Sequence, residues 1–98
     1  MNIFGYKFKG PYEIGDEVID EPAVYIIVNP KDSIVDVDQV NEEGIDLKNH
    51  KRKPCWEENG GSQFYVAQMP LEEYNEKDRK QLVNQIRETI DYIPCNKD

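Results

Sequence analysis

The chain has 98 residues, of which 38% are hydrophobic and 33% charged, and its formal net charge is −8. This length suits one domain with one modest core, so we expect a single domain over residues 1–98. The negative charge opposes nonspecific binding to nucleic acids and anionic membranes. No apolar stretch approaches 18 residues and no secretory leader is visible, so we expect no membrane span and a cytoplasmic protein.

The first quarter of the chain predicts one strand followed by an acidic loop. Aromatic residues alternate with Gly and Lys over residues 4–8, which indicates a half-buried strand that Gly10-Pro11 ends. Residues 12–22 are rich in acids and turn formers and predict an ordered lead-in loop.

A hairpin is predicted next. Val24–Val28 is apolar and mostly β-branched, which is typical of a central strand buried on both faces. Residues 29–32 (Asn-Pro-Lys-Asp) have turn chemistry, with proline at the second position. Ser33–Val37 then forms the second strand.

Two helices and a third strand are predicted in the second half. Asn41 can cap a helix that runs to about His50 and that Pro54 stops. Residues 59–62 form a flexible loop, and Gln63–Gln68 form the third strand.

The last predicted element is a longer helix capped by Asn75 and ended by Pro94. Its core stripe at helical spacing consists of Leu82, Val83, Ile86 and Ile90. The order of elements predicts an α+β domain with a small, three-stranded, mainly antiparallel sheet flanked by helices.

The two cysteines, Cys55 and Cys95, lie 40 residues apart in a chain with one histidine and no C-x-x-C spacing. A four-ligand zinc site therefore lacks its usual ligands. Reduced thiols are the default for a cytoplasmic protein, and a disulfide or a redox pair is the open alternative.

Three segments carry a similarity to a known family: residues 24–28, 34–39 and 47–56, the last reading Leu-Lys-Asn-His-Lys-Arg-Lys-Pro-Cys-Trp. In this order and spacing they resemble the GIY-YIG nuclease domain. The resemblance covers about residues 23–96, with the strand and acidic loop of residues 1–22 before it. It implies a three-stranded antiparallel sheet flanked by helices, and metal-dependent phosphodiester cleavage.

The resemblance also implies where catalytic residues should lie, and most of them are replaced. Tyr25 matches the tyrosine of the first motif, and His50 matches the histidine. The replaced positions are Asp36 and Asp38 for the tyrosine and glycine of the second motif, Asp46 for the helix arginine, and Asn84 for the metal-binding glutamate. An arginine that stabilises a reacting phosphate is worth about 10³–10⁵ in rate, so an acid in its place opposes catalysis.

Asp36 and Asp38 lie two apart on a predicted strand, so both side chains face one side. We favour a solvated acidic face. A weak Mg²⁺ or Ca²⁺ site, with Asp46 or Glu42 as a further ligand, and a DNA-mimicking surface are the alternatives.

The other candidates also have a structural and a functional interpretation. For Tyr25 and His50 we favour packing and capping roles over phosphate contact or catalysis. The basic cluster consists of Lys48, Lys51, Arg52 and Lys53. We favour a solvated helix end for it, with anion or nucleic-acid contact as the alternative.

These observations lead to two functional hypotheses. The first is a catalytically degenerate GIY-YIG-like protein, without a cofactor, that acts as a non-enzymatic binding module for an unknown protein partner and binds nucleic acid weakly or not at all. The second is a metal-dependent endonuclease, or another phosphodiester-processing enzyme, with a rewired carboxylate site.

Overall fold

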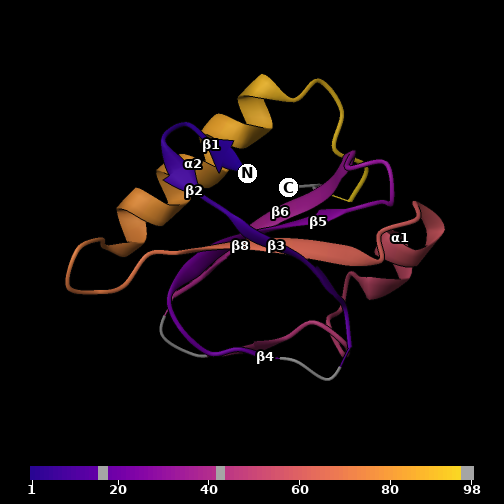
Figure 1. Ribbon diagram of the computed structural model, residues 1–98, viewed down its shortest axis with the longest axis horizontal. Coiled ribbons are helices and arrows are strands. Elements are labelled where there is room, and N and C mark those ends of the chain that lie inside the picture. Colours follow the sequence, from indigo (N-terminus) through magenta and orange to yellow (C-terminus); the bar gives the residue numbers. More distant parts are fainter. Residues whose placement is uncertain (16–17, 42–43, 96–98) are drawn as a thin grey trace.

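The structure is a computed structural model that describes residues 1–15, 18–41 and 44–95. Its elements are β1 (Asn2–Ile3), β2 (Tyr6–Lys7), β3 (Lys9–Glu13), β4 (Val18–Ile19), β5 (Ala23–Val28), β6 (Ile34–Val40), β7 (Ile45–Asp46), α1 (Lys53–Glu58), β8 (Gln63–Gln68) and α2 (Glu76–Thr89). A four-stranded antiparallel sheet in the order β3-β8-β5-β6 forms the centre of this α+β fold (Figure 1). Two short ribbons, β1-β2 and β4-β7, accompany it.

The predicted hairpin is confirmed as β5 and β6. Every residue of β5 is buried, as expected for a central strand whose two faces are both covered. In the turn, Asn29 Oδ1 accepts hydrogen bonds from the backbone N–H groups of Lys31 and Ser33, at 2.9 and 3.0 Å. The second strand runs three residues beyond the predicted end at Val37.

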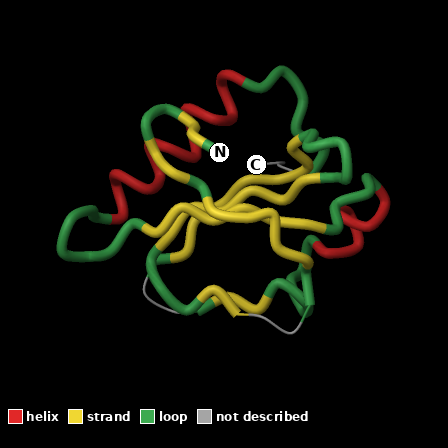
Figure 2. Tube along the Cα trace, viewed as in Figure 1, coloured by secondary structure: helices red, strands yellow, loops and turns green. Residues whose placement is uncertain are grey.

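The sheet separates two apolar clusters. On one face, Leu82, Val83 and Ile86 of α2 pack against the even-numbered residues of β5. On the other face, Trp56 of α1 and Leu47 pack against the odd-numbered residues. Figure 2 shows α2 along one side of the sheet and the β4-β7 ribbon on the opposite side.

The start of α2 is confirmed in detail. Asn75 Oδ1 accepts from the backbone N–H of Asp78, and Asp78 Oδ2 accepts from the backbone N–H of Asn75, a reciprocal capping box. The helix ends at Thr89, before Pro94, and Ile90 is its extended C-cap residue. Of the predicted stripe, Leu82, Val83 and Ile86 are buried, whereas Ile90 is partly buried.

The N-terminal prediction was wrong in three respects. Residues 4–8 do not form one strand, because Phe4 and Gly5 adopt positive φ angles of 52° and 84° and turn the chain between β1 and β2. Gly10-Pro11 does not end a strand but lies within β3, which makes the sheet four-stranded rather than three-stranded. A proline is tolerated there because β3 is an edge strand. Within the predicted loop 12–22, Val18–Ile19 form β4.

The predicted helix from Asn41 to His50 was also wrong. Ile45–Asp46 form β7, which pairs with β4, and Glu42 and Glu43 lie outside the described residues. The helix lies later, as α1, and Pro54 lies in its first turn instead of stopping it. A proline fits the first turn because its missing N–H has no partner there in any helix.

A disulfide joins Cys55 of α1 to Cys95 in the C-terminal segment, with 5.8 Å between the Cα atoms. The expected reduced thiols are therefore replaced by the alternative that the sequence left open. The backbone N–H of Cys95 also donates to the carbonyl of Val35 at 3.0 Å, so the segment is attached to both α1 and β6. No helix in the described part of the chain is long and apolar enough to cross a membrane.

Candidate functional site

Five polar side chains meet on the α1 face of the sheet: Tyr25, Asp36, Asp38, His50 and Arg52. The strand register explains three of them. Tyr25 pairs with Asp38 and Ile27 with Asp36, so the acids and the tyrosine point to the same face of the β5-β6 hairpin. His50 and Arg52 come from the turns that lead into α1 at the end of the sheet (Figure 1). We call these five residues the α1-face cluster.

Asp36 lies at the bottom of the α1-face cluster, with a side-chain exposed fraction of 0%. Its Oδ2 accepts a hydrogen bond from Trp56 Nε1 at 2.7 Å, and its Oδ1 accepts from the backbone N–H of Val37 at 2.8 Å. Burial raises the pKa of Asp36, while the Trp56 hydrogen bond and the Arg52 charge act in the opposite direction. The Trp56 hydrogen bond and the Arg52 charge therefore favour the ionised form of this buried carboxyl group.

Arg52 bridges the two acids. Its Nε lies 2.9 Å from Asp36 Oδ2, an ion pair that lacks the alignment of a hydrogen bond, and its Nη2 donates to Asp38 Oδ2 at 2.6 Å. Burial tends to lower the pKa of Arg52, but the charges of Asp36 and Asp38 outweigh it and the net shift is upward. The Arg52 side chain is 21% exposed, the Asp38 side chain 33% and the Asp36 side chain 0%, so the Asp36 side of the bridge is the less screened one.

His50 connects this bridge to Tyr25. Its Nδ1 accepts from the backbone N–H of Arg52 at 3.0 Å, its Nε2 lies 3.4 Å from the Tyr25 hydroxyl, and its ring stacks on Trp56. Burial, followed by the Arg52 charge, lowers the pKa of His50, so the ring is neutral at pH 7. Because Nδ1 accepts, the proton of the neutral ring is on Nε2, which donates to the tyrosine oxygen.

Tyr25 is 0% exposed, and burial, followed by the charge of Asp38, raises the pKa of its hydroxyl well above the ordinary value. The hydroxyl therefore stays protonated near neutral pH and is a poor nucleophile or base. The expectation that Tyr25 and Asp36 lie on adjacent antiparallel strands is confirmed.

The α1-face cluster has little room for a metal ion. Asp36 Oδ2 and Asp38 Oδ2 both contact the Arg52 side chain, so a cation would have to displace a guanidinium. In the described ranges, no group of three or more His, Cys, Asp or Glu side chains could hold a metal. The chemistry that this arrangement offers is hydrogen bonding and charge pairing within the protein.

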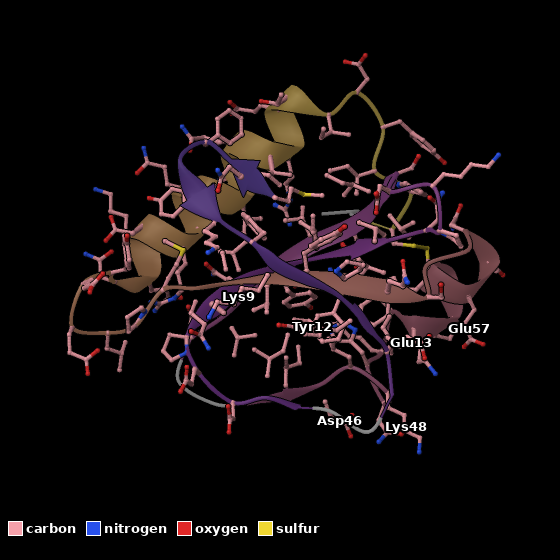
Figure 3. All side chains as sticks on the ribbon, in the orientation of Figure 1. Lys9, Tyr12, Glu13, Asp46, Lys48 and Glu57 are labelled. Carbon is pink, nitrogen blue, oxygen red and sulfur yellow. A yellow bond between two sulfur atoms is a disulfide. The ribbon has the colours of Figure 1, made fainter. Side chains whose placement is uncertain are left out.

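The structure leaves two of the positions that the resemblance singled out, Asp46 and Asn84, outside the α1-face cluster. Asp46 lies on β7, and its carboxylate accepts from the backbone N–H of Lys48 at 3.0 Å and from Asn49 Nδ2 at 2.6 Å. Figure 3 shows Asp46 and Lys48 at the lower edge, pointing away from the sheet. Asn84 is exposed on α2, whose buried residues pack on the opposite face of the sheet.

The basic cluster does not form one surface. Arg52 turns inward to the two acids, whereas Lys48 and Lys51 are exposed and Lys53 is half-buried. Sequence reasoning missed this inward role of Arg52 and also missed Arg79, a buried arginine of α2 with an exposed fraction of 1%. A signal for Arg79 was present, because it precedes Leu82 by three residues and Val83 by four, at the spacing of the core stripe.

Comparisons of the chain with family models, with curated proteins and with solved structures give no significant match. The geometry of the described residues is thus the basis for any statement about function.

Proposed function

We propose that this chain is a catalytically degenerate, GIY-YIG-like protein that acts as a non-enzymatic binding module. The observation that carries the proposal is the Arg52 guanidinium held between Asp36 and Asp38, at 2.9 and 2.6 Å. A nuclease needs an arginine that is free to meet a phosphate and acids that are free to meet a metal. Here these groups neutralise one another.

The remaining members of the α1-face cluster support the same conclusion. Tyr25 stays protonated, and His50 has a partner at each ring nitrogen. Two acids and one guanidinium sum to a charge of −1 around a neutral histidine, which repels a phosphodiester. The antiparallel strands β6, β5 and β8 and the flanking helices fit the expected scaffold, and β3 adds a further strand.

A nuclease assay tests the proposal. The purified protein is incubated with Mg²⁺ or Mn²⁺ and with plasmid, branched or single-stranded DNA, and we expect no cleavage above the buffer control. Cleavage that is lost in His50→Gln and kept in the exposed control Lys51→Gln would overturn the proposal. A contaminating nuclease would cleave equally in both variants.

A rewired carboxylate enzyme is the second candidate, favoured by the convergence of Tyr25, His50 and an arginine on one face of the sheet. Calorimetric titration with Mg²⁺ and Mn²⁺ separates the two candidates. The enzyme requires a binding isotherm that Asp36→Asn or Asp38→Asn abolishes. The module requires none, and we expect a flat titration.

We propose a protein as the partner of the module, with nucleic-acid binding weak or absent. Because Arg52 is engaged internally, the basic cluster makes at most three phosphate contacts, which give a log–log salt slope no steeper than about −2.7 on duplex DNA. Fluorescence polarisation at physiological salt should show no binding tighter than about 10⁻⁴ M. Sub-micromolar binding at 200 mM salt would contradict this part of the proposal.

A cytoplasmic location is also part of the proposal, and the Cys55–Cys95 bond provides its test. Cytosolic glutathione and thioredoxin keep most thiols reduced, so a cytoplasmic location predicts that this disulfide is absent in the cell. Alkylation of thiols in cells quenched with acid measures the native redox state. Two alkylated cysteines support the cytoplasm, and none would place the protein in an oxidising compartment.

A further inference from the structure

An open cavity of about 750 Å³ lies apart from the α1-face cluster, between the end of β6, the start of β7 and the turn that leads into α2. That turn is at the left of the molecule in Figure 1. The cavity is lined by one buried cation, by side-chain amides and by several apolar side chains, so its chemistry is mixed.

Arg79 is the cation that lines the cavity. Its Nε donates to Asn41 Oδ1 at 3.0 Å, and its Nη1 donates to the carbonyls of Met69 and Tyr74 at 3.2 and 3.4 Å. Within residues 1–15, 18–41 and 44–95, Nη2 has no partner and no carboxylate pairs with the guanidinium. Nη2 is also absent from the buried atoms without a partner, so it is accessible from the cavity.

A guanidinium that is 1% exposed and has only neutral partners is costly, because arginine cannot lose its proton to escape burial. Buried charges are ordinarily paired, so this one is prepared for an anion. The two carbonyls and Asn41 fix the orientation of the Arg79 guanidinium. Its Nη2 remains as the donor that can meet a ligand.

The rest of the lining narrows the class of ligand. Leu71 is 55% exposed, and Val40 and Ile45 lie on the same cavity, so its walls suit an apolar body. Glu76 also lines it, and the sequence places acids at 72 and 73, which disfavours polyanions such as phosphates.

We propose that this cavity binds a small monocarboxylate with an aliphatic body, its carboxylate on Arg79 Nη2 and its chain on Leu71. The site goes beyond the proposed function and does not depend on it. A simple branched acid and an aliphatic α-amino acid share this chemistry. An ammonium group would gain the charge of Glu76, so the amino acid should bind more tightly.

The test is a titration of the full ¹⁵N-labelled chain with isovalerate, leucine and isoamyl alcohol, followed by NMR. We expect isovalerate to shift the backbone signals of residues 39–41 and 71–76 with a Kd on the order of 1 mM, as befits so small a ligand. Isoamyl alcohol, which lacks the carboxylate, should bind at least ten-fold more weakly. Tighter binding of leucine than of isovalerate assigns the site to amino acids, and the reverse assigns it to simple acids. Equal binding of the alcohol, or no shift with either acid, overturns the proposal.

Variants locate the ligand. Arg79→Lys keeps the charge but loses the fork and should weaken isovalerate binding at least ten-fold. Because Arg79 also bonds two carbonyls, that variant tests folding as well as binding. Leu71→Ser changes an exposed residue and should weaken binding about five-fold in a normally folded chain, while Tyr92→Ser, at a 75% exposed residue away from the cavity, should leave it unchanged. Equal affinities in wild type and Leu71→Ser would place the ligand elsewhere.

Discussion

Replacement of Arg52 by glutamine should destabilise the fold by an amount that depends on pH. The substitution leaves the Asp36 carboxylate, which is 0% exposed, without its cation. Removal of one partner of a buried pair costs about 3–5 kcal/mol. Asp38 is 33% exposed, so its contact adds no more than a surface pair would, and we expect the lower end, about 3 kcal/mol. For a chain of this size that loss lowers Tm by about 12–24 °C.

The pH dependence identifies the mechanism. The Arg52 charge lowers the pKa of Asp36, so its loss leaves burial opposed more weakly and raises that pKa further. The folded variant then binds a proton more readily than the unfolded chain does, and its stability rises as the pH falls. The difference in unfolding free energy between wild type and Arg52→Gln should therefore shrink from pH 7.5 to pH 5.0.

Urea denaturation at both pH values measures these quantities. Lys51→Gln removes the same charge from an exposed neighbour and should stay within about 0.5 kcal/mol of wild type. Adding Asp36→Asn to Arg52→Gln should restore about 1–2 kcal/mol, since the amide oxygen still accepts from Trp56 while the buried charge is gone. A cost below 1 kcal/mol, equal at both pH values, would show that the bridge is a screened surface pair and would refute the reasoning.

Three further variants probe the same face of the sheet. Burial lowers the pKa of His50, so part of the stability should be lost as pH falls below about 6.5, and His50→Gln should lose less over that range in urea titrations. Gly61→Ala should cost about 1–3 kcal/mol, because its Cβ would lie 2.8 Å from the buried Ile27 Cγ2; an unchanged Tm would contradict this contact. Replacing Cys55 and Cys95 by serine opens a loop spanning 40 residues and should cost roughly 4 kcal/mol, whereas reductant should affect wild type alone.

Part of the fold follows from local pattern alone. The run of β-branched residues in β5, the turn residues after it and the strand Gln63–Gln68 each have a clear signal, and the structure confirms all three. The capping box before α2 is another local signal, complete within four residues. In these places one short segment contains the information that decides its conformation.

The errors arose where the deciding partner lies far away in the sequence. Ile45–Asp46 forms a strand because Val18–Ile19 is beside it, which no local pattern in either segment indicates. Pro54 fits both the end and the beginning of a helix, and the choice depended on whether the preceding segment was helical. Pro11 similarly fits a strand only because that strand lies at the edge of the sheet.

The candidate site was also predictable only where a local pattern decides the arrangement. The period of two along a strand predicts that Asp36 and Asp38 share a face, and the structure places them so. The partner between them, Arg52, lies 14 residues after Asp38 in a segment with the wrong predicted conformation. Its interpretation as part of a solvated basic cluster followed from that error.

The segment with the strongest family resemblance has a structural role of its own. Helix α1 has only six residues and no side-chain hydrogen bond at its N-cap, so it is too short to persist without tertiary contacts. Residues 47–56, the run that carries the resemblance, make those contacts themselves. Trp56 binds Asp36, Cys55 is joined to Cys95, and His50 stacks on Trp56.

The same residues thus need no catalytic role to explain their types and spacing. The arginine four residues before the tryptophan completes the charge balance around Asp36, the carboxylate that the tryptophan binds. If this anchoring is the reason for the run, catalytic activity and the run are separable. The run would then hold the short helix α1 on the sheet whether or not the chain has a catalytic site.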